Sequence, residues 1–212
     1  MNKAFDNEMY LKLQSEKILE RVTTFGDKLY LEFGGKLFDD YHASRVLPGF
    51  EPDSKLKMLL TLKEKVEVVI VISSLDIQKN KIRSDLNINY ESEVLRLIDA
   101  FRASELYVGS VCISQYQAIP QVESFKQKLN NLGIKTYIHY HIDGYPHDIN
   151  KVISDEGFGK NEYIHTERPI VVVTAPGPGS GKMATCLSQL YHENIRGIKA
   201  GYAKYETFPV RN

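Results

Sequence analysis

The sequence predicts an α/β protein with a mainly parallel sheet and helices on both faces. Apolar residues at helical spacing alternate along the chain with short β-branched runs, and this alternation indicates crossover connections between parallel strands. Two runs, Val66–Ser73 and Pro169–Thr174, are apolar at successive positions, which is typical of strands buried on both faces. We therefore expect a three-layer fold, Rossmann-like or P-loop-like, with these two strands near the centre of the sheet.

The individual elements follow from local sequence. Asp6 is placed to cap a first helix that continues to Phe25, and Gly26 can end it. Later helices show the same spacing of apolar residues, and each strand is a short run of β-branched or aromatic residues. The expected helices lie near residues 6–25, 52–60, 94–101, 122–132 and 182–193, and the expected strands are Lys28–Phe33, Val66–Ser73, Tyr107–Ser114, Thr136–Ile142, Pro169–Thr174 and Ile198–Tyr205.

The length of 212 residues suits a single α/β domain over residues 1–212. A weak boundary is expected in the loop-rich stretch 143–168. The chain ends at Asn212, shortly after a strand and without a closing helix, whereas an open sheet normally continues past such a point. We therefore expect the chain to be the N-terminal fragment of a longer protein.

Composition and charge narrow the classes of function. Lys and Arg together number 27, as do Asp and Glu, so no net field attracts nucleic acid or an anionic membrane. No apolar run reaches the roughly 18–20 residues that cross a bilayer. Cys112 and Cys186 stand 74 positions apart, which excludes a zinc site built from cysteines and fits a reducing compartment. The sequence predicts a cytoplasmic protein without nucleic-acid or membrane partners and leaves a homo-oligomer open.

The strongest functional pattern is a glycine-rich loop between the strand Pro169–Thr174 and the next helix. Gly177, Gly179, Ser180 and Gly181 could cradle a phosphate through backbone N–H groups and the serine hydroxyl, and Lys182 could add a positive charge at the helix start. The expected ligand is a nucleotide, ATP or GTP, or another small phosphorylated metabolite. The alternative is a plain turn that only links strand to helix.

The match to the P-loop pattern GxxxxGK[ST] is partial. Gly181 and Lys182 fit, but the first glycine falls on Pro176 and the Mg²⁺-binding Ser/Thr falls on Met183. Thr185, three residues beyond the lysine and nearly a helical turn away, is the remaining candidate for binding the cofactor with a hydroxyl, and the spacing leaves open whether it substitutes. Binding of Mg²⁺ in the usual manner is therefore not predicted.

A dinucleotide fingerprint fits the same loop. Gly179, Gly181 and Ala184 match GxGxxA, and Glu206 lies 22 positions further on, near the spacing of about 20 at which an acidic residue holds a ribose hydroxyl. NAD(P) is therefore an alternative cofactor. Pro176 and the lysine within the fingerprint count against it.

Two other polar clusters are candidates. Asp39, His42 and Arg45 follow the first strand, where ligands of open α/β sheets gather, and could act as base, acid or base, and phosphate clamp. A polar loop with a capped turn explains them equally well. His139, His141 and Asp143 could ligate a metal if they share a strand face. We favour a polar strand end there and predict no metal site.

Three strings carry a resemblance over essentially the whole chain: FGGKLFDDYHASRVLPGFEPDSK, SDEGFGKNEYI and VVVTAPGPGSGKMATCLSQLYHE. They are similar to a bacterial family known only as a domain of unknown function, some members of which have been labelled ATP-dependent peptidases. The resemblance implies a cytoplasmic α/β protein that continues beyond this chain. It supplies no reaction and no catalytic residues.

Three functions remain compatible with the residues. The first is phosphoryl transfer or nucleotide hydrolysis, in which Lys182 neutralises developing charge and Asp39, His42 and Arg45 react or position. The second is a dinucleotide-dependent oxidoreductase with Glu206 on the ribose. The third is a non-catalytic sensor or assembly module for a phosphorylated ligand.

Overall fold

The computed structural model describes residues 5–205 except 27, 35–36 and 39–40, with the side chains of 41–43 also left undescribed. Its main sheet has six parallel strands in the order β6-β5-β2-β7-β1-β8. The predicted α/β class with a parallel sheet is confirmed. The strands are β1 Leu29–Phe33, β2 Val66–Ser73, β5 Tyr107–Ser114, β6 Lys135–Ile138, β7 Ile170–Thr174 and β8 Gly201–Tyr205.

The two runs predicted to be central occupy the middle of the sheet. Strands β2 and β7 pair with each other, and every residue of both strands is buried. Continuous β-branched sequence is what a strand covered on both faces requires.

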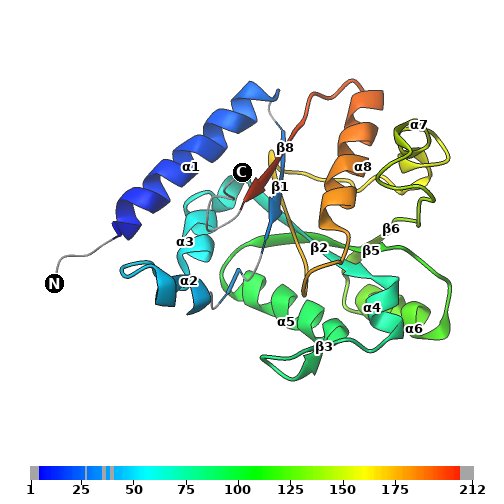
Figure 1. Ribbon diagram of the computed structural model, residues 1–212, viewed down its shortest axis with the longest axis horizontal. Helices are drawn as coiled ribbons and strands as arrows, with labels where there is room; N and C mark the ends of the chain where they lie inside the picture. The colour runs from blue at the N-terminus through cyan, green and yellow to red at the C-terminus, as the bar shows by residue number, and fades with distance from the viewer. Residues whose placement is uncertain (1–4, 27, 35–36, 39–40, 206–212) are drawn as a thin grey trace.

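Helices cover both faces, as predicted, but unequally (Figure 1). One face packs against α1, α3, α5 and α6 in a large core that includes Met58, Val94 and Phe125. The other face packs against α8 through Cys186 and Leu190, with part of the 137–164 segment completing the cover. The helices are α1 Asn7–Thr24, α3 Ser54–Thr61, α5 Tyr90–Ala103, α6 Pro120–Asn131 and α8 Lys182–Ile195.

Local sequence explains where the helices begin and end. The Asp6 side chain accepts a hydrogen bond from the backbone N–H of Met9 at 3.0 Å, which caps α1. Gly26 follows the helix with φ +95°, a conformation that favours glycine. Asn89 caps α5 in the same way by accepting from the N–H of Ser92 at 2.9 Å.

Short elements escaped the sequence analysis because they are too short to show a period. They are helices α2 Tyr41–Val46, α4 Ser74–Gln78 and α7 Ile149–Val152, the hairpin of β3 Ile82–Arg83 and β4 Ile88–Asn89, and the 3₁₀ turns Lys63–Lys65 and Phe158–Lys160.

The fourth strand is shorter than expected. β6 ends at Ile138 rather than at Ile142. Beyond it, the N–H of His139 still donates to the Ile113 carbonyl of β5 at 3.0 Å, whereas the N–H of Tyr140 faces the edge of the sheet and donates to the side chain of Asn161 at 2.7 Å. Among the described residues, backbone pairing with β5 stops after His139, and local periodicity cannot reveal that point.

Candidate functional site: a cavity at the carboxyl edge of the central strands

The strand order places a crevice beside the glycine loop. The chain leaves β2 towards β5 on one side, whereas it leaves β7 through α8 towards β8 on the other. Connections that diverge in this way leave open space beyond the carboxyl ends of the two strands, where open α/β sheets bind ligands. The glycine loop of residues 175–181 joins β7 to α8 at this point (Figure 1).

A cavity of about 620 Å³ lies here. This is a volume within the range of small-molecule sites. It combines the glycine loop with polar groups from three other parts of the chain: the end of β1, the end of β8, and the β3–β4 hairpin with the start of α5. The lining includes Glu32, Arg83, Asp85, Tyr90, Gly177, Gly179, Lys182 and Lys204.

The loop is braced from within. The Ser180 hydroxyl donates to the carbonyl of Gly177 at 2.9 Å, and the Ser114 hydroxyl donates to the carbonyl of Ser180 at 2.7 Å. Gly179 and Gly181 adopt φ of +79° and +91°, which glycine accommodates without strain. Ser180 is fully buried and its hydroxyl is used inside the loop, so its contribution lies in loop shape.

The outer side of the loop leaves its backbone donors unused. Within the described part of the chain, no hydrogen bond engages the N–H groups of residues 179–183. Helix α8 also has no side-chain cap at Gly181. The first N–H groups of a helix lack intrahelical partners and carry its positive dipole end, so they are available to an anion.

Lys182, the first residue of α8, lies among these backbone N–H groups. It is half-buried, lines the 620 Å³ cavity and forms no ion pair with any described residue. Burial lowers the pKa of the Lys182 ammonium; the charge of Glu32 opposes this shift and the charge of Lys204 adds to it. A lysine that loses hydration without gaining a partner carries positive charge available to a ligand.

Glu32 is a cavity residue that the sequence analysis missed. It lies near the carboxyl end of β1, in register with Val173 of β7. Its side chain is on the α8 face of the sheet because Tyr30, two residues earlier, packs there. Glu32 is only 6% exposed, and the Tyr202 hydroxyl donates to its Oε2 at 2.6 Å. A lone carboxylate within the otherwise apolar strand LYLEF was the available signal.

Tyr90 and Lys81, next to the β3–β4 hairpin, contact the glycine loop. A Cβ added to Gly177 would lie 2.1 Å from the Tyr90 hydroxyl oxygen, so only glycine permits this close approach. Lys81 lies over the Tyr90 ring at 4.8 Å and pairs with Asp76 at 3.0 Å. Its ammonium also donates to the Pro178 carbonyl at 3.5 Å.

Several predicted site residues lie elsewhere. Thr185 is buried and lines a separate cavity of about 190 Å³. Arg45, in the last turn of α2, is exposed and does not line the 620 Å³ cavity. Asp39, Glu206 and the side chain of His42 fall outside the described residues.

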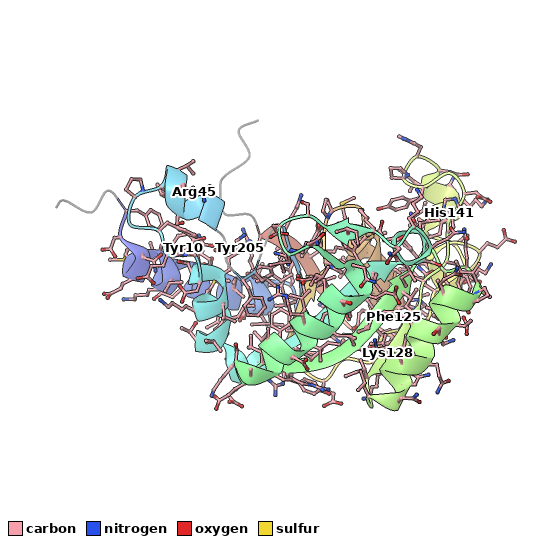
Figure 2. All side chains as sticks on the ribbon, turned by 90° about the horizontal axis from the view of Figure 1, so that it is seen from below. Tyr10, Arg45, Phe125, Lys128, His141 and Tyr205 are labelled. Atoms are coloured by element: carbon pink, nitrogen blue, oxygen red, sulfur yellow. The ribbon has the colours of Figure 1, made fainter. Side chains whose placement is uncertain are left out.

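The histidine cluster does not form one face. His139 is buried, with Nε2 at 3.1 Å from the carbonyl oxygen of Glu162, and burial lowers its pKa to about 4. His141 is exposed, with Nε2 at 3.4 Å from Asp143, and lies at the far end of the molecule from Arg45 (Figure 2). The described residues contain no group of three or more His, Cys, Asp and Glu placed to hold a metal.

A larger cavity of about 660 Å³ lies between α7 and α8 but has a different character. Its described lining is mainly apolar, including Ile149, Phe158, Met183 and Leu187, and no charged side chain is among those lining residues. It therefore lacks the charged groups expected around phosphate. The 620 Å³ cavity is the better candidate despite its slightly smaller volume.

Sheet order, glycine loop and adjoining cavity together define a three-layer α/β protein with a polar cavity at the carboxyl edge of its central strands. The chain belongs to the family described as domain of unknown function DUF1846, N-terminal, whose model matches residues 3–212. The predicted resemblance to an uncharacterised family is confirmed.

Relatives in this family are longer than the chain. It is 58% identical over 209 residues to a UPF0371 protein of Streptococcus pyogenes serotype M5 (strain Manfredo) and 59% identical over 209 residues to one of Streptococcus thermophilus (strain ATCC BAA-491 / LMD-9). Each alignment covers 99% of this chain and 42% of the relative. Among the helices of the described residues, none has both the length and the apolar character needed to cross a membrane.

Proposed function

We propose that this chain binds the phosphate groups of a nucleotide or phosphorylated metabolite in the 620 Å³ cavity. One observation carries the proposal: the N–H groups of residues 179–183 have no hydrogen bond within the described chain, and the unpaired Lys182 lies beside them. Backbone donors and a positive charge at one helix start are the recurring elements of phosphate sites.

The residues around the loop support binding over a plain turn. A turn that only links strand to helix needs neither a half-buried lysine without a partner nor an adjoining cavity. Here the cavity is lined by Lys182 and Lys204. Phosphate would restore favourable interactions to the lysine that burial has partly removed from water.

The strand order argues for a mononucleotide or phosphorylated metabolite rather than a dinucleotide. In the dinucleotide-binding fold, the strand after the glycine loop lies next to the strand before it. Here β1 separates β7 from β8. The end of β8 therefore lies one strand further from the loop than the fingerprint requires.

Binding and catalysis are separate questions. In a phosphoryl-transfer enzyme or nucleotide hydrolase, Lys182 would neutralise charge on the transferred group. Arg45 does not line the cavity, so it is not the group we expect to meet a phosphate held there. Turnover of bound ligand would separate an enzyme from a sensor or assembly module.

The test is a binding screen followed by titration. Thermal shifts of the chain and of the full-length protein would be measured with ATP, GTP, NAD(P), sugar phosphates and tripolyphosphate, and positive ligands titrated by calorimetry. Lys182→Met should abolish or strongly weaken the response. Lys128→Met, an exposed lysine on α6 (Figure 2), is the matched control and should behave as the parent. A parent that binds none of these phosphates would refute the proposal.

A further inference from the structure

Glu32 is an unexpected group in a cavity built for anions. It is more than nine-tenths buried and lines the same cavity as Lys182. Its Oε2 accepts from Tyr202, but no hydrogen bond to a described residue engages its Oε1. Oε1 is not fully buried either, so part of its surface remains accessible. One carboxylate oxygen is therefore left for something in the cavity.

An ionised carboxylate can only accept hydrogen bonds. Phosphate oxygens are acceptors too, so Glu32 and a bound phosphate would repel each other unless a cation or donor stands between them. Glu32 is in register with Val173, one residue before β7 ends and the glycine loop follows. The carboxylate is thus on the strand adjacent to the loop, at the loop's end of the sheet.

We propose that Glu32 is the protein carboxylate of a divalent-cation site shared with the ligand, so that the chain binds the Mg²⁺ complex of a nucleotide or polyphosphate. This inference rests on the proposed phosphate site. Mg²⁺ is commonly held by one or two carboxylates together with substrate phosphates and several waters, rather than by an all-protein cage. That mode needs no cluster of protein ligands, and the described residues contain none.

The position of Glu32 makes up for the missing hydroxyl of the loop. In P-loop proteins Mg²⁺ is held by a loop Ser/Thr and by a carboxylate from another strand. In this chain the loop position is Met183, which is exposed, and Thr185 lines the other cavity. Glu32 is the carboxylate from another strand, and it would hold the cation without the loop hydroxyl.

The experiment compares phosphate binding with and without the cation. The full-length protein and this chain would each be titrated with tripolyphosphate and with a non-hydrolysable ATP analogue, in excess MgCl₂ or in EDTA. For the parent, we expect Mg²⁺ to tighten binding at least tenfold. Glu32→Gln should bring the Mg²⁺-to-EDTA affinity ratio close to one, and in EDTA it should bind at least as tightly as the parent, because the repelling charge is gone.

The controls separate the possible failures. Glu67→Gln changes a buried carboxylate at the amino end of β2, which accepts from the N–H of Glu167 at 2.6 Å, and should keep the parent's ratio. Lys182→Met should weaken binding in both conditions. The parent protein also tests the cation site without any variant. Its ternary complex with Mn²⁺ and tripolyphosphate would be detected by water proton relaxation.

The outcomes distinguish failure of the cation site from failure of the phosphate site. A parent ratio near one, or a Glu32→Gln ratio equal to the parent's, overturns the cation site while leaving the phosphate site intact. An effect of Glu32→Gln seen with the nucleotide but not with tripolyphosphate would assign Glu32 to a ribose hydroxyl and would also overturn the cation site. A parent that binds neither probe in either condition overturns the phosphate site itself.

Discussion

Replacing Lys182 by Met isolates the charge of the glycine loop. Methionine keeps most of the aliphatic stem and the helical start of α8 but removes the ammonium. In the free protein that ammonium is half-buried and unpaired among the described residues, and burial lowers its pKa. The variant should therefore fold as well as the parent, or slightly better.

The effect of Lys182→Met on ligand affinity should be unfavourable and larger than its effect on stability. A hydrogen bond to a charged group contributes roughly 1.5–3 kcal/mol, and about 1.4 kcal/mol corresponds to a tenfold change in affinity. Lys182→Met should thus weaken a phosphate ligand about tenfold to a hundredfold or more. Opposite signs for stability and affinity identify a residue kept for binding rather than for the fold.

Two assays are needed on the same samples. Urea unfolding gives the stability, and calorimetric titration with a phosphate ligand found in the screen gives the affinity. Affinity of the parent should also fall as pH rises through the lowered pKa of Lys182, a dependence that Lys182→Met should lack. Equal affinities of parent and variant at pH 7 would show that the loop is only a turn.

Three further perturbations follow from the structure. Gly181→Ala forces φ +91° on alanine and places its Cβ 3.0 Å from the Ser114 hydroxyl oxygen, whereas the Cβ of Gly179→Ala meets nothing within 4 Å. Gly179→Ala should lower the free energy of unfolding in urea by about 1 kcal/mol. Gly181→Ala should lower it by more. Ser114→Ala removes the 2.7 Å bond to the Ser180 carbonyl, and a loss of about 1 kcal/mol is expected, with no loss counting against the brace. Because burial lowers the pKa of His139 from 6.5 to about 4, the unfolded chain takes up the proton first. The stability present above pH 6.5 should decline by about 3 kcal/mol as the pH falls from about 6.5 to about 4. His139→Gln should flatten that part of the pH–stability curve, and an unchanged curve would contradict the assignment.

Much of the architecture was readable from local sequence because the patterns are strong and continuous. The β-branched run Val66–Ser73 was typical of a strand with both faces covered, and it occupies the middle of the sheet. Asp6 and Gly26 marked the ends of α1 because capping depends on a few adjacent residues. The short hairpin and α4 were missed because two to five residues carry no period.

The glycine loop was likewise visible in sequence, since strand, glycines, lysine and amphipathic helix follow one another along the chain. The sequence also suggested that the Ser180 hydroxyl would contact the ligand, and it left open whether Thr185 replaces the missing hydroxyl. In the structure, neither side chain is available to a ligand in the 620 Å³ cavity. The Ser180 hydroxyl donates to a carbonyl within the loop, and Thr185 lines another cavity. Neither placement follows from residue spacing.

The sequence by itself determined the strands, the main helices and the loop that offers free N–H groups, because each depends on neighbours within a few residues. Only the tertiary structure decided which groups meet at that loop. Strand order inserts β1 between β7 and β8 and so brings Glu32, about 150 positions from Lys182, into the same cavity. Sheet order is set by packing of whole faces, and no local pattern records it.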